Sequence, residues 1–362
     1  MNNAPTRPAH DIEAAHVAVL KEAKALREKE PEKARRLAEE ALSLIGAASA
    51  FECDKAEAHF ILGAICSRTG NPELGIEHAE TALSLYNKNL YDKHGASLAA
   101  CDALNLIGFL QFNRANFSDA IARHQASFNG YERLNEKKGM ASALNYLGNV
   151  YQTLGDYANA LEHYERSLAL RREIGDRRGA IVNIGNIGAV NFALANFDVA
   201  LSNFRDVLQQ KEQEGDMRGA ASALMNIGSV LFALKDYEGT EHHHQKSLAL
   251  FRKLGDRYAV AMSQRNNGKF YEQQARYDRA LDAHQECLAI REEIGDRHGL
   301  ALTLVDLGGV LMKLSRYPDA YSTLIKGLTL AVELGTKHTE LECYLSLGKF
   351  FSERRMHSNR TS

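Results

Sequence analysis

Prolines, paired cysteines and long apolar runs are all scarce in this sequence, and each scarcity excludes a class of structure. Five prolines in 362 residues are few helix breakers, and Ala, Leu, Glu and Arg are abundant, so the composition favours helix throughout. No two cysteines form a C-x-x-C pair, and their odd number argues against a disulfide framework and against a structural zinc site. We therefore expect a reducing compartment for the five cysteines, which are Cys53, Cys66, Cys101, Cys287 and Cys343.

The chain also lacks an excess of charge, a signal sequence and a membrane-length apolar segment. Lys and Arg total 44 against 46 Asp and Glu, for a formal net charge of −2. That balance gives no general attraction to nucleic acid or to an anionic membrane. The N-terminus has no basic region followed by an apolar run, and no stretch approaches eighteen uninterrupted apolar residues. These features predict a soluble cytoplasmic protein.

Glycines recur along the chain at a constant spacing of 40 residues, most of them preceded by Leu or Ile. A second column of mostly small residues follows each glycine by twelve positions, from Ala120 to Ala320. A fixed period of this length is the sequence signature of a repeat array. The glycines in phase are Gly108, Gly148, Gly188, Gly228, Gly268, Gly308 and Gly348.

One unit, residues 137–176, predicts the structure of a repeat. Leu144, Leu147, Gly148 and Tyr151 recur at i, i+3, i+4 and i+7, which is one face of a helix. A Gly-Asp pair then ends the helix, since Gly suits the position after a helix and Asp suits the N-cap of the next. A second apolar stripe follows, before another Gly-Asp pair. Each repeat is therefore predicted to be two antiparallel helices, A and B.

The small residues predict close packing within each hairpin. We expect Gly148 on helix A to face Ala160 on helix B, so that the two backbones approach closely. A glycine inside a helix alone would cost roughly 1 kcal/mol, but seven at the same phase indicate a packing role. A single hairpin cannot bury its stripe, so neighbouring hairpins must stack.

The repeat register divides the chain into segments. It is strictest between about residues 97 and 336, and it loosens towards the N-terminus, where Gly63 precedes Gly108 by 45 residues. The final helix A has no helix B after it. The predicted segments are a disordered N-terminus at 1–10, a degenerate hairpin at 11–50, the repeat array at 51–336, an unpaired terminal helix at 337–355 and a tail at 356–362.

The pattern L-x-x-[LI]-G-x-x-Y with a later Ala resembles the tetratricopeptide repeat (TPR) family, over about residues 50–355. The 40-residue unit, with G-D-[RM]-x-[GA] between repeats, is similar to Pins/LGN-type scaffolds and to TPR arrays of bacterial signalling proteins. The resemblance implies an all-α solenoid, a right-handed superhelix whose helices A line a concave groove that holds a peptide. Two departures are the absence of the first-helix Trp and of the closing Pro.

Asparagines form a ladder in the phase that faces the groove in TPR geometry. Asn186, Asn226 and Asn266 stand two residues before the repeat glycine, and Asn149 stands one residue after it. Each amide carries a donor and an acceptor, so a column of them could bind the main chain of an extended peptide. The alternative is that Asn is tolerated on a solvated face; the shared phase favours the groove.

Basic residues flank the last of these asparagines. Arg265 and Lys269 lie at i and i+4, and Lys313 lies one repeat further, so the three could bind an acidic ligand or a C-terminal carboxylate. The alternative, which we favour, is a solvated surface with ion pairs to Glu272 and Asp306. Six residues before the glycine, where Pins/LGN-like repeats often carry Arg, the residues are Ser142, Val182, Ser222, Met262 and Leu302.

Other conspicuous residues have structural interpretations. His242, His243 and His244 resemble a metal tract, but successive helical residues point in different directions. His244 also belongs to a core column with His124, Tyr164, Phe204 and His284. Gly185–Gly188 resembles part of a nucleotide loop but follows a helical pattern, and Cys287 lies in a column of mostly small residues.

The sequence thus predicts a protein-interaction scaffold that binds an extended peptide or a partner protein in its groove. It predicts no enzyme activity, cofactor or metal. The alternative is a sensory or regulatory TPR module of a signalling protein, of the nucleotide cyclase or kinase type, that lacks its output domain. Weak homodimers through residues 337–355 are a further expectation, because Tyr344, Leu347 and Phe351 have no following helix to cover them.

Overall fold

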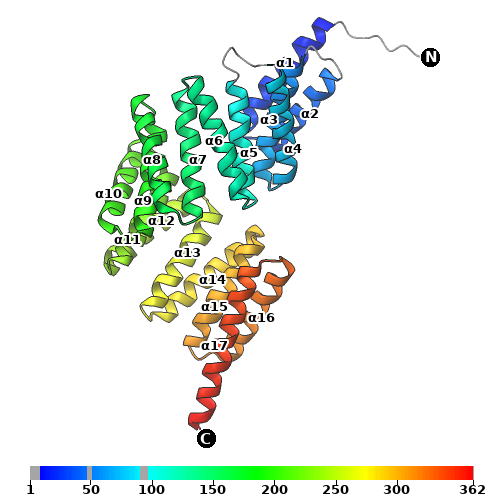
Figure 1. The fold of residues 1–362 in the computed structure, drawn as a ribbon. Coiled ribbons are helices and arrows are strands. Elements are labelled where there is room, and N and C mark those ends of the chain that lie inside the picture. The colour runs from blue at the N-terminus through cyan, green and yellow to red at the C-terminus, as the bar shows by residue number, and fades with distance from the viewer. Residues whose placement is uncertain (1–8, 47–50, 90–96, 362) are drawn as a thin grey trace, which may run out of the picture. The chain divides into compact units, whose positions relative to one another are not determined.

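The computed structural model describes residues 9–46, 51–89 and 97–361, and these residues form an all-α solenoid of helical hairpins, as predicted (Figure 1). The chain divides into two compact units, Met1–Leu194 and Ala195–Ser362. The first unit contains the helices α1 (Ala9–Leu26), α2 (Pro31–Ile45), α3 (Glu52–Thr69), α4 (Pro72–Asn89), α5 (Leu98–Asn113), α6 (Phe117–Arg133), α7 (Lys137–Thr153), α8 (Tyr157–Glu173) and α9 (Arg177–Ala193).

Within each unit, consecutive helices pack against one another and helices A also contact the next helix A along the chain. In the parts of the chain that are described, no helix is long and apolar enough to cross a membrane. The second unit contains α10 (Phe197–Gln213), α11 (Met217–Ala233), α12 (Tyr237–Lys253), α13 (Arg257–Gln273), α14 (Tyr277–Ile294), α15 (Arg297–Lys313), α16 (Tyr317–Glu333) and α17 (Lys337–Thr361).

The two ends of the chain differ in extent from the predicted segments. Helix α1 already begins at Ala9, inside the segment 1–10 that was expected to be disordered; residues 1–8 lie outside the described residues. Helix α17 continues to Thr361, past the predicted end at 355, so described residues of the expected tail 356–362 are helical. No Gly or Pro follows Gly348, so the sequence contains no strong helix breaker at that end.

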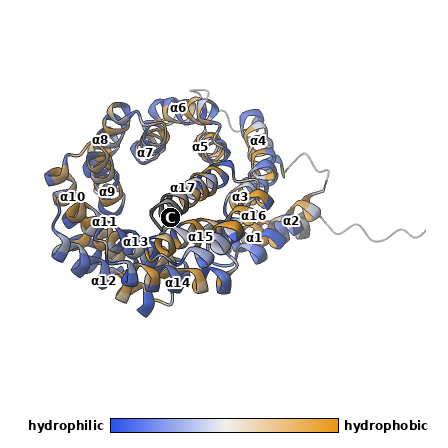
Figure 2. Cartoon of the chain, turned by 90° about the horizontal axis from the view of Figure 1, so that it is seen from below, coloured by the Kyte–Doolittle hydropathy of each residue, from blue (hydrophilic) through white to orange (hydrophobic). Residues whose placement is uncertain are grey.

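Each helix carries hydrophobic and hydrophilic residues (Figure 2), and the hydrophobic ones form the cores of the two units. Ile61, Ile107 and Leu147 are fully buried in the first unit, and Ile227 and Leu324 in the second. Burying one such side chain contributes about 1.5–3 kcal/mol. The apolar stripes at i, i+3, i+4 and i+7 are therefore the source of the stacking.

At Gly63 the repeat glycine faces a small residue of helix B as predicted, since an added Cβ atom would lie 3.0 Å from the carbonyl oxygen of Gly75, but at Gly148 the nearest group is a ring. A Cβ atom added at Gly148 would lie 2.5 Å from the ring of Tyr164, which is fully buried. Gly228 stands against His244 in the same way, four residues beyond the expected neighbour Thr240. At these two positions the glycine thus provides room for a large ring, because a ring lying flat on a helix needs the volume of the missing side chain.

The column of rings predicted for the core is buried. The exposed fraction is 1% for His124, 0% for Tyr164, 3% for Phe204, 7% for His244 and 0% for His284. His242 is exposed and His243 half-buried, so the three consecutive histidines occupy three different environments. Cys287 is fully buried, with its Sγ atom 3.4 Å from the Thr303 hydroxyl, which agrees with the predicted packing role.

The Gly-Asp linkers combine three local features: a glycine with positive φ, an aspartate N-cap and an ion pair. Gly175 has a positive φ of 71°, which glycine adopts without a steric penalty. Asp176 caps α9, because its Oδ1 atom accepts a hydrogen bond of 2.9 Å from the backbone N–H of Gly179. Gly179 has no side chain where the Arg171 guanidinium lies, 3.6 Å from the other oxygen of Asp176. The last Gly of G-D-R-x-G therefore leaves room for a cationic side chain from the preceding helix B.

The turns within hairpins use a left-handed residue without requiring glycine. Ala115, Lys235 and Ser315 have φ values of 57°, 63° and 59°, where Gly155 has 77°. Such a conformation costs an L-residue roughly 1–2 kcal/mol. The surrounding helices therefore impose these turns on residues whose own preferences oppose them.

Candidate functional site

The positions predicted to face the groove line a cavity of about 650 Å³ in the first unit. In α5 and α7 the lining includes the residues six and two positions before the repeat glycine, and α5 adds Phe109, one residue after it. This is the phase of the predicted asparagine ladder. Apolar side chains provide much of the wall, namely Phe60, Ala64, Leu98, Leu106, Phe109 and Tyr146.

Asp102 gives the cavity an acidic group, and the hydroxyl of buried Tyr131 holds that carboxylate in place. The Tyr131 hydroxyl donates a hydrogen bond of 2.5 Å to Oδ1 of Asp102. Burial raises the pKa of Asp102, while this hydrogen bond lowers it, and burial also raises the pKa of Tyr131. The second oxygen of Asp102 has no hydrogen bond to the described residues. A cation or an N–H donor entering the cavity would therefore find an available acceptor there.

Basic side chains line the same cavity. Arg27 places its guanidinium 5.9 Å from the centre of the Phe60 ring. Arg68 and Lys138 are exposed and line the cavity too. With carboxylates at Glu28, Glu136 and Asp102, the cavity carries formal charges of both signs around apolar walls. Such a mixture suits the alternating polar and apolar groups of a peptide.

Sequence reasoning missed this cavity because it looked for polar residues in the groove columns. The signal that could have found it is the presence of apolar and aromatic side chains in those same columns. Phe109 and Tyr146 come from successive helices A, and their ring centres lie 6.2 Å apart. Tyr146 also stacks on buried His124, with ring centres 5.0 Å apart, so the core supports the cavity wall.

Two of the predicted groove asparagines, Asn149 and Asn186, lie in the first unit and are hydrogen-bonded. Asn186 donates to Oδ1 of Asn145 at 3.1 Å and, more weakly, to Oδ1 of Asn149 at 3.5 Å. Asn149 also accepts a hydrogen bond of 2.8 Å from Tyr164. Asn145 accepts a further bond of 3.2 Å from buried Asn183. These amides form a network across α7 and α9.

The other predicted site residues belong to the second unit. Asn226 is exposed and bonds to none of the residues that the structure describes. Asn266 is half-buried, and its Nδ2 atom lies 3.2 Å from the Met225 sulfur. Lys313 is exposed at the end of α15. Amide groups in this unit are therefore open to a ligand to a larger extent than those of the first.

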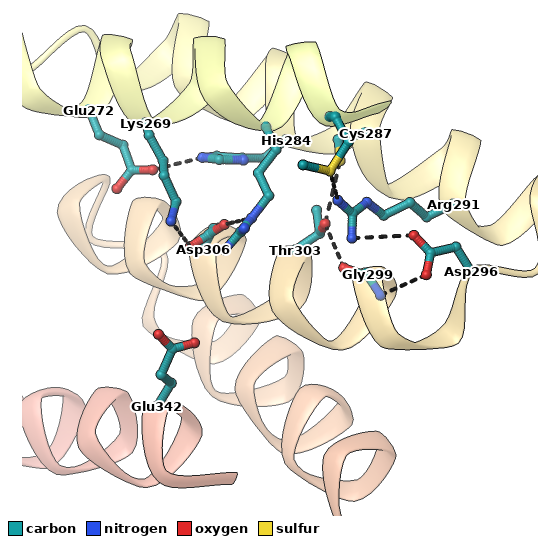
Figure 3. A network of polar contacts seen from close by, with 12 residues as sticks. Lys269, Glu272, His284, Cys287, Arg291, Asp296, Gly299, Thr303, Asp306 and Glu342 are labelled. Atoms are coloured by element: carbon teal, nitrogen blue, oxygen red, sulfur yellow. Dashed lines mark hydrogen bonds and ion pairs between the residues drawn. The ribbon is translucent and has the colours of Figure 1, made fainter. Parts of the chain in front are cut away.

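Lys269 pairs with Asp306 (Figure 3), and so does Arg265, as the alternative expected, although the side chains of Arg265 and Asp306 are only 17% and 14% exposed. The Lys269 ammonium lies 3.6 Å from the carboxylate, and Arg265 lies closer, with its Nε atom donating to the other oxygen. Glu272 instead bonds to His284, at 2.7 Å. One carboxylate between two cations leaves one net positive charge at this point of α13 and α15.

Comparison with known proteins identifies the repeats. Residues 139–213 and 219–293 match the family model of the tetratricopeptide repeat. The first segment runs from α7 to α10 and the second from α11 to α14. The comparison with curated protein sequences found no match. The matched segments therefore contain tetratricopeptide repeats, and the described chain is an all-α solenoid of helical hairpins.

Several solved structures share this fold at low sequence identity. A STAND-type signal transduction ATPase with a tetratricopeptide repeat sensor, from Pyrococcus horikoshii, has a TM-score of 0.64 at 14% identity, over 91% of this chain and 50% of that one. The apo form of RapI has a TM-score of 0.63 at 14% identity, over 78% and 99% of the two chains. A Rap protein complexed with competence and sporulation factor has a TM-score of 0.60 at 16% identity, over 96% and 99%.

Proposed function

We propose that this chain is a non-catalytic scaffold that binds an extended peptide segment of a partner protein on its helices A. The observation that carries the proposal is the cavity of the first unit. Its lining includes residues two positions before and one position after the repeat glycine, which are the positions predicted to face the groove. The matched tetratricopeptide repeats support a protein partner, and so does the structural likeness to a Rap protein that was solved with a competence and sporulation factor. The finer resemblance to Pins/LGN-type scaffolds is part of the proposal.

The cavity favours a peptide with an apolar anchor beside a basic group. An aliphatic or aromatic side chain would pack on Phe60, Phe109 and Tyr146, and a neighbouring cation would meet Asp102. Burial of the anchor supplies affinity, and the carboxylate supplies orientation.

Selection of peptides from a random display library on the purified chain tests this proposal. Selected peptides should bind Phe109→Ala at least about tenfold more weakly than the parent, because truncating a central aromatic hot spot costs about 2 kcal/mol or more. Tyr258→Ala, which removes an aromatic residue that is 58% exposed outside the cavity, is the matched control. Equal binding by both variants, or selected peptides without apolar anchors, would count against the cavity as the site.

The alternative proposal is a sensory module of a signalling protein. It is favoured by the Pyrococcus horikoshii structure, in which a tetratricopeptide repeat sensor belongs to a larger ATPase and this chain spans half of that one. Mass spectrometry of the protein isolated from its natural source, covering the entire polypeptide, would distinguish the two. A fused catalytic domain would favour the sensory module, and its absence would favour the scaffold.

Self-association through α17 is a separate part of the proposal. Leu341, Tyr344, Leu345 and Phe351 are between 55% and 58% exposed and follow one another at helical spacing. Leu347, by contrast, is buried. We expect weak, concentration-dependent dimers that Phe351→Glu abolishes, measured by sedimentation over a wide concentration range. Monomers of both proteins at every concentration would exclude dimerisation.

A further inference from the structure

Two histidines face each other within the hairpin of α3 and α4. The Nδ1 atoms of His59 and His78 are 3.0 Å apart, and their ring centres are 5.2 Å apart. Both side chains are half-buried. Two neutral imidazoles can share one proton at this distance, if one ring carries its hydrogen on Nδ1 and the other accepts it.

The pair is an exception to the repeat pattern. His59 stands four residues before its repeat glycine, Gly63, where later repeats carry mostly apolar side chains. The residues at this position are Leu104, Leu144, Ile184, Leu224, Gln264 and Leu304. Packing alone therefore favours Leu or Ile at this position. An imidazole there loses apolar contacts and gains a polar partner on the opposite helix.

The geometry of the two rings suits a shared cation. The two Nδ1 atoms face each other nearly end-on, so with both hydrogens on Nε2 each ring must turn to aim its lone pair at a common ion beside the line between them. A metal ion about 2.0–2.1 Å from each nitrogen would subtend an N–metal–N angle of about 91–97° across the 3.0 Å separation. That is the angle between adjacent ligands in square-planar and octahedral coordination, and a small widening would suit tetrahedral coordination.

The surroundings keep the rings neutral and the site negative. Burial lowers the pKa of both histidines, so their lone pairs are available at neutral pH. Glu77 acts electrostatically on both rings, and Glu39 on α2 acts on His78. A carboxylate near two neutral imidazoles attracts a divalent cation to the site even when the carboxylate does not bind the cation directly.

We propose that His59 and His78 form a two-histidine site for a divalent transition metal of the kind that imidazole prefers, Cu²⁺, Ni²⁺ or Zn²⁺. Water fills the other coordination positions, since no group of three or more His, Cys, Asp or Glu side chains converges among the described residues. Copper binds most tightly of the three. The site lies on a different pair of side chains from the peptide cavity and does not depend on the proposed function.

Metal bound there ties two antiparallel helices together. The ligands come from α3 and α4, nineteen residues apart in sequence. Because the unfolded chain does not hold these rings together, the metal binds the folded hairpin preferentially and stabilises it. Metal should therefore slow amide exchange in α3 and α4 before it affects the second unit.

Titration of the untagged full chain with Cu²⁺, Ni²⁺ or Zn²⁺ alone, after removal of metal by a chelator, tests the site. We expect one preferred site at pH 7.5, with the order Cu²⁺ tightest, and at least a tenfold weaker affinity for His59→Gln and for His78→Gln. Loss of an outer-shell partner alone usually weakens a metal site 10- to 100-fold, so loss of a direct ligand should reach that range. Binding that is unchanged in both variants would overturn the proposal.

His163→Gln is the matched control. His163 lies fifteen residues after its repeat glycine, as His78 does, but it bonds to the Asn159 carbonyl of its own helix and has Leu144 at the position of His59. Its replacement should leave the preferred site intact. A loss equal to that of His78→Gln would show that surface histidines bind the metal without the pair.

A measurement on the unmodified chain covers the case in which a variant fails to fold. Diethyl pyrocarbonate acylates accessible histidines, and mass spectrometry locates the modified rings. One equivalent of Cu²⁺ should protect His59 and His78 at least about tenfold, while exposed His242 stays reactive. Equal reactivity of His59 and His78 with and without metal would refute the site.

Discussion

Helices A of the two units carry polar residues at equivalent repeat positions but use them differently. In the first unit Asn186 of α9 donates hydrogen bonds to both Asn145 and Asn149 of α7. In the second unit Asn226 is exposed, and a carboxylate at Asp306 pairs with Arg265. The same position therefore serves stability in one unit and leaves a group for a ligand in the other. Substitutions at equivalent sites should separate these two roles.

Acid should weaken the first unit by the largest amount, through His124. Burial lowers the pKa of His124 to about 4 from an ordinary 6.5. Between these values the unfolded chain binds a proton that the folded unit does not, so stability is lost as the pH falls from 6.5 towards 4. The loss reaches roughly 2–3 kcal/mol. Hydrogen exchange of α5 and α6 at pH 7 and pH 4.5 measures it, and His124→Gln should reduce the difference. An equal difference in that variant would assign the acid response to other groups.

Valine at the repeat glycines should destabilise both units alike. In Gly148→Val the new methyls meet the ring of Tyr164, and in Gly228→Val they meet His244. Overpacking of this kind costs about 1–3 kcal/mol. Thermal unfolding should show a lower midpoint for each variant. A variant as stable as the parent would mean that the ring leaves its place without cost, and that the contrast between the units extends to their cores.

Removing the shared acceptor of the amide network should cost less. Asn145→Ala leaves the side-chain N–H groups of Asn183 and Asn186 without their partner, and Asn183 is fully buried. We expect a loss of about 1–2 kcal/mol in the first unit, since unpaired buried polar groups carry their desolvation penalty. Urea unfolding followed by exchange in α7 and α9 measures it. No loss would show that water replaces Asn145 at no cost.

Asn226→Ala should have the smallest effect on stability and should act on binding instead. An exposed side chain without a bond to the described residues contributes within about 0.5 kcal/mol to folding. A hydrogen bond to a ligand would be worth about 0.5–1.5 kcal/mol. Calorimetry with a display-selected peptide that still binds Phe109→Ala should show weaker binding at an unchanged thermal midpoint. Unchanged affinity would place the ligand away from this asparagine.

Sequence periodicity predicted much of the fold and little of the site's detail. The in-phase glycines, the Gly-Asp linkers and the buried ring column follow from patterns that repeat every 40 residues. The ring nearest to Gly148 was not predicted, because two columns of helix B, small residues and rings, were both open to the glycine and only packing decides which lies nearer. The cavity was missed because a sequence pattern does not distinguish Phe109 and Tyr146 from core residues.

The left-handed turns show the same division. Lys235 and Ala275 adopt positive φ values of 63° and 54° although neither prefers them. Hairpin packing on both sides outweighs the cost of the left-handed backbone, so the conformation cannot be predicted from residue preferences. At Gly175 the preference and the structure agree, and there the sequence sufficed.

By itself the sequence determined the repeat length, the helix type and the buried stripes, because these depend on interactions between residues close in the chain or equivalent in successive repeats. Only the tertiary structure decided which side chains meet across helices. The bond between Asn186 and Asn145, the pair of Asp306 with Arg265 and the contact of His59 with His78 each join separate helices. Their existence depends on helix rotation and on choices among rotamers, which periodicity does not encode.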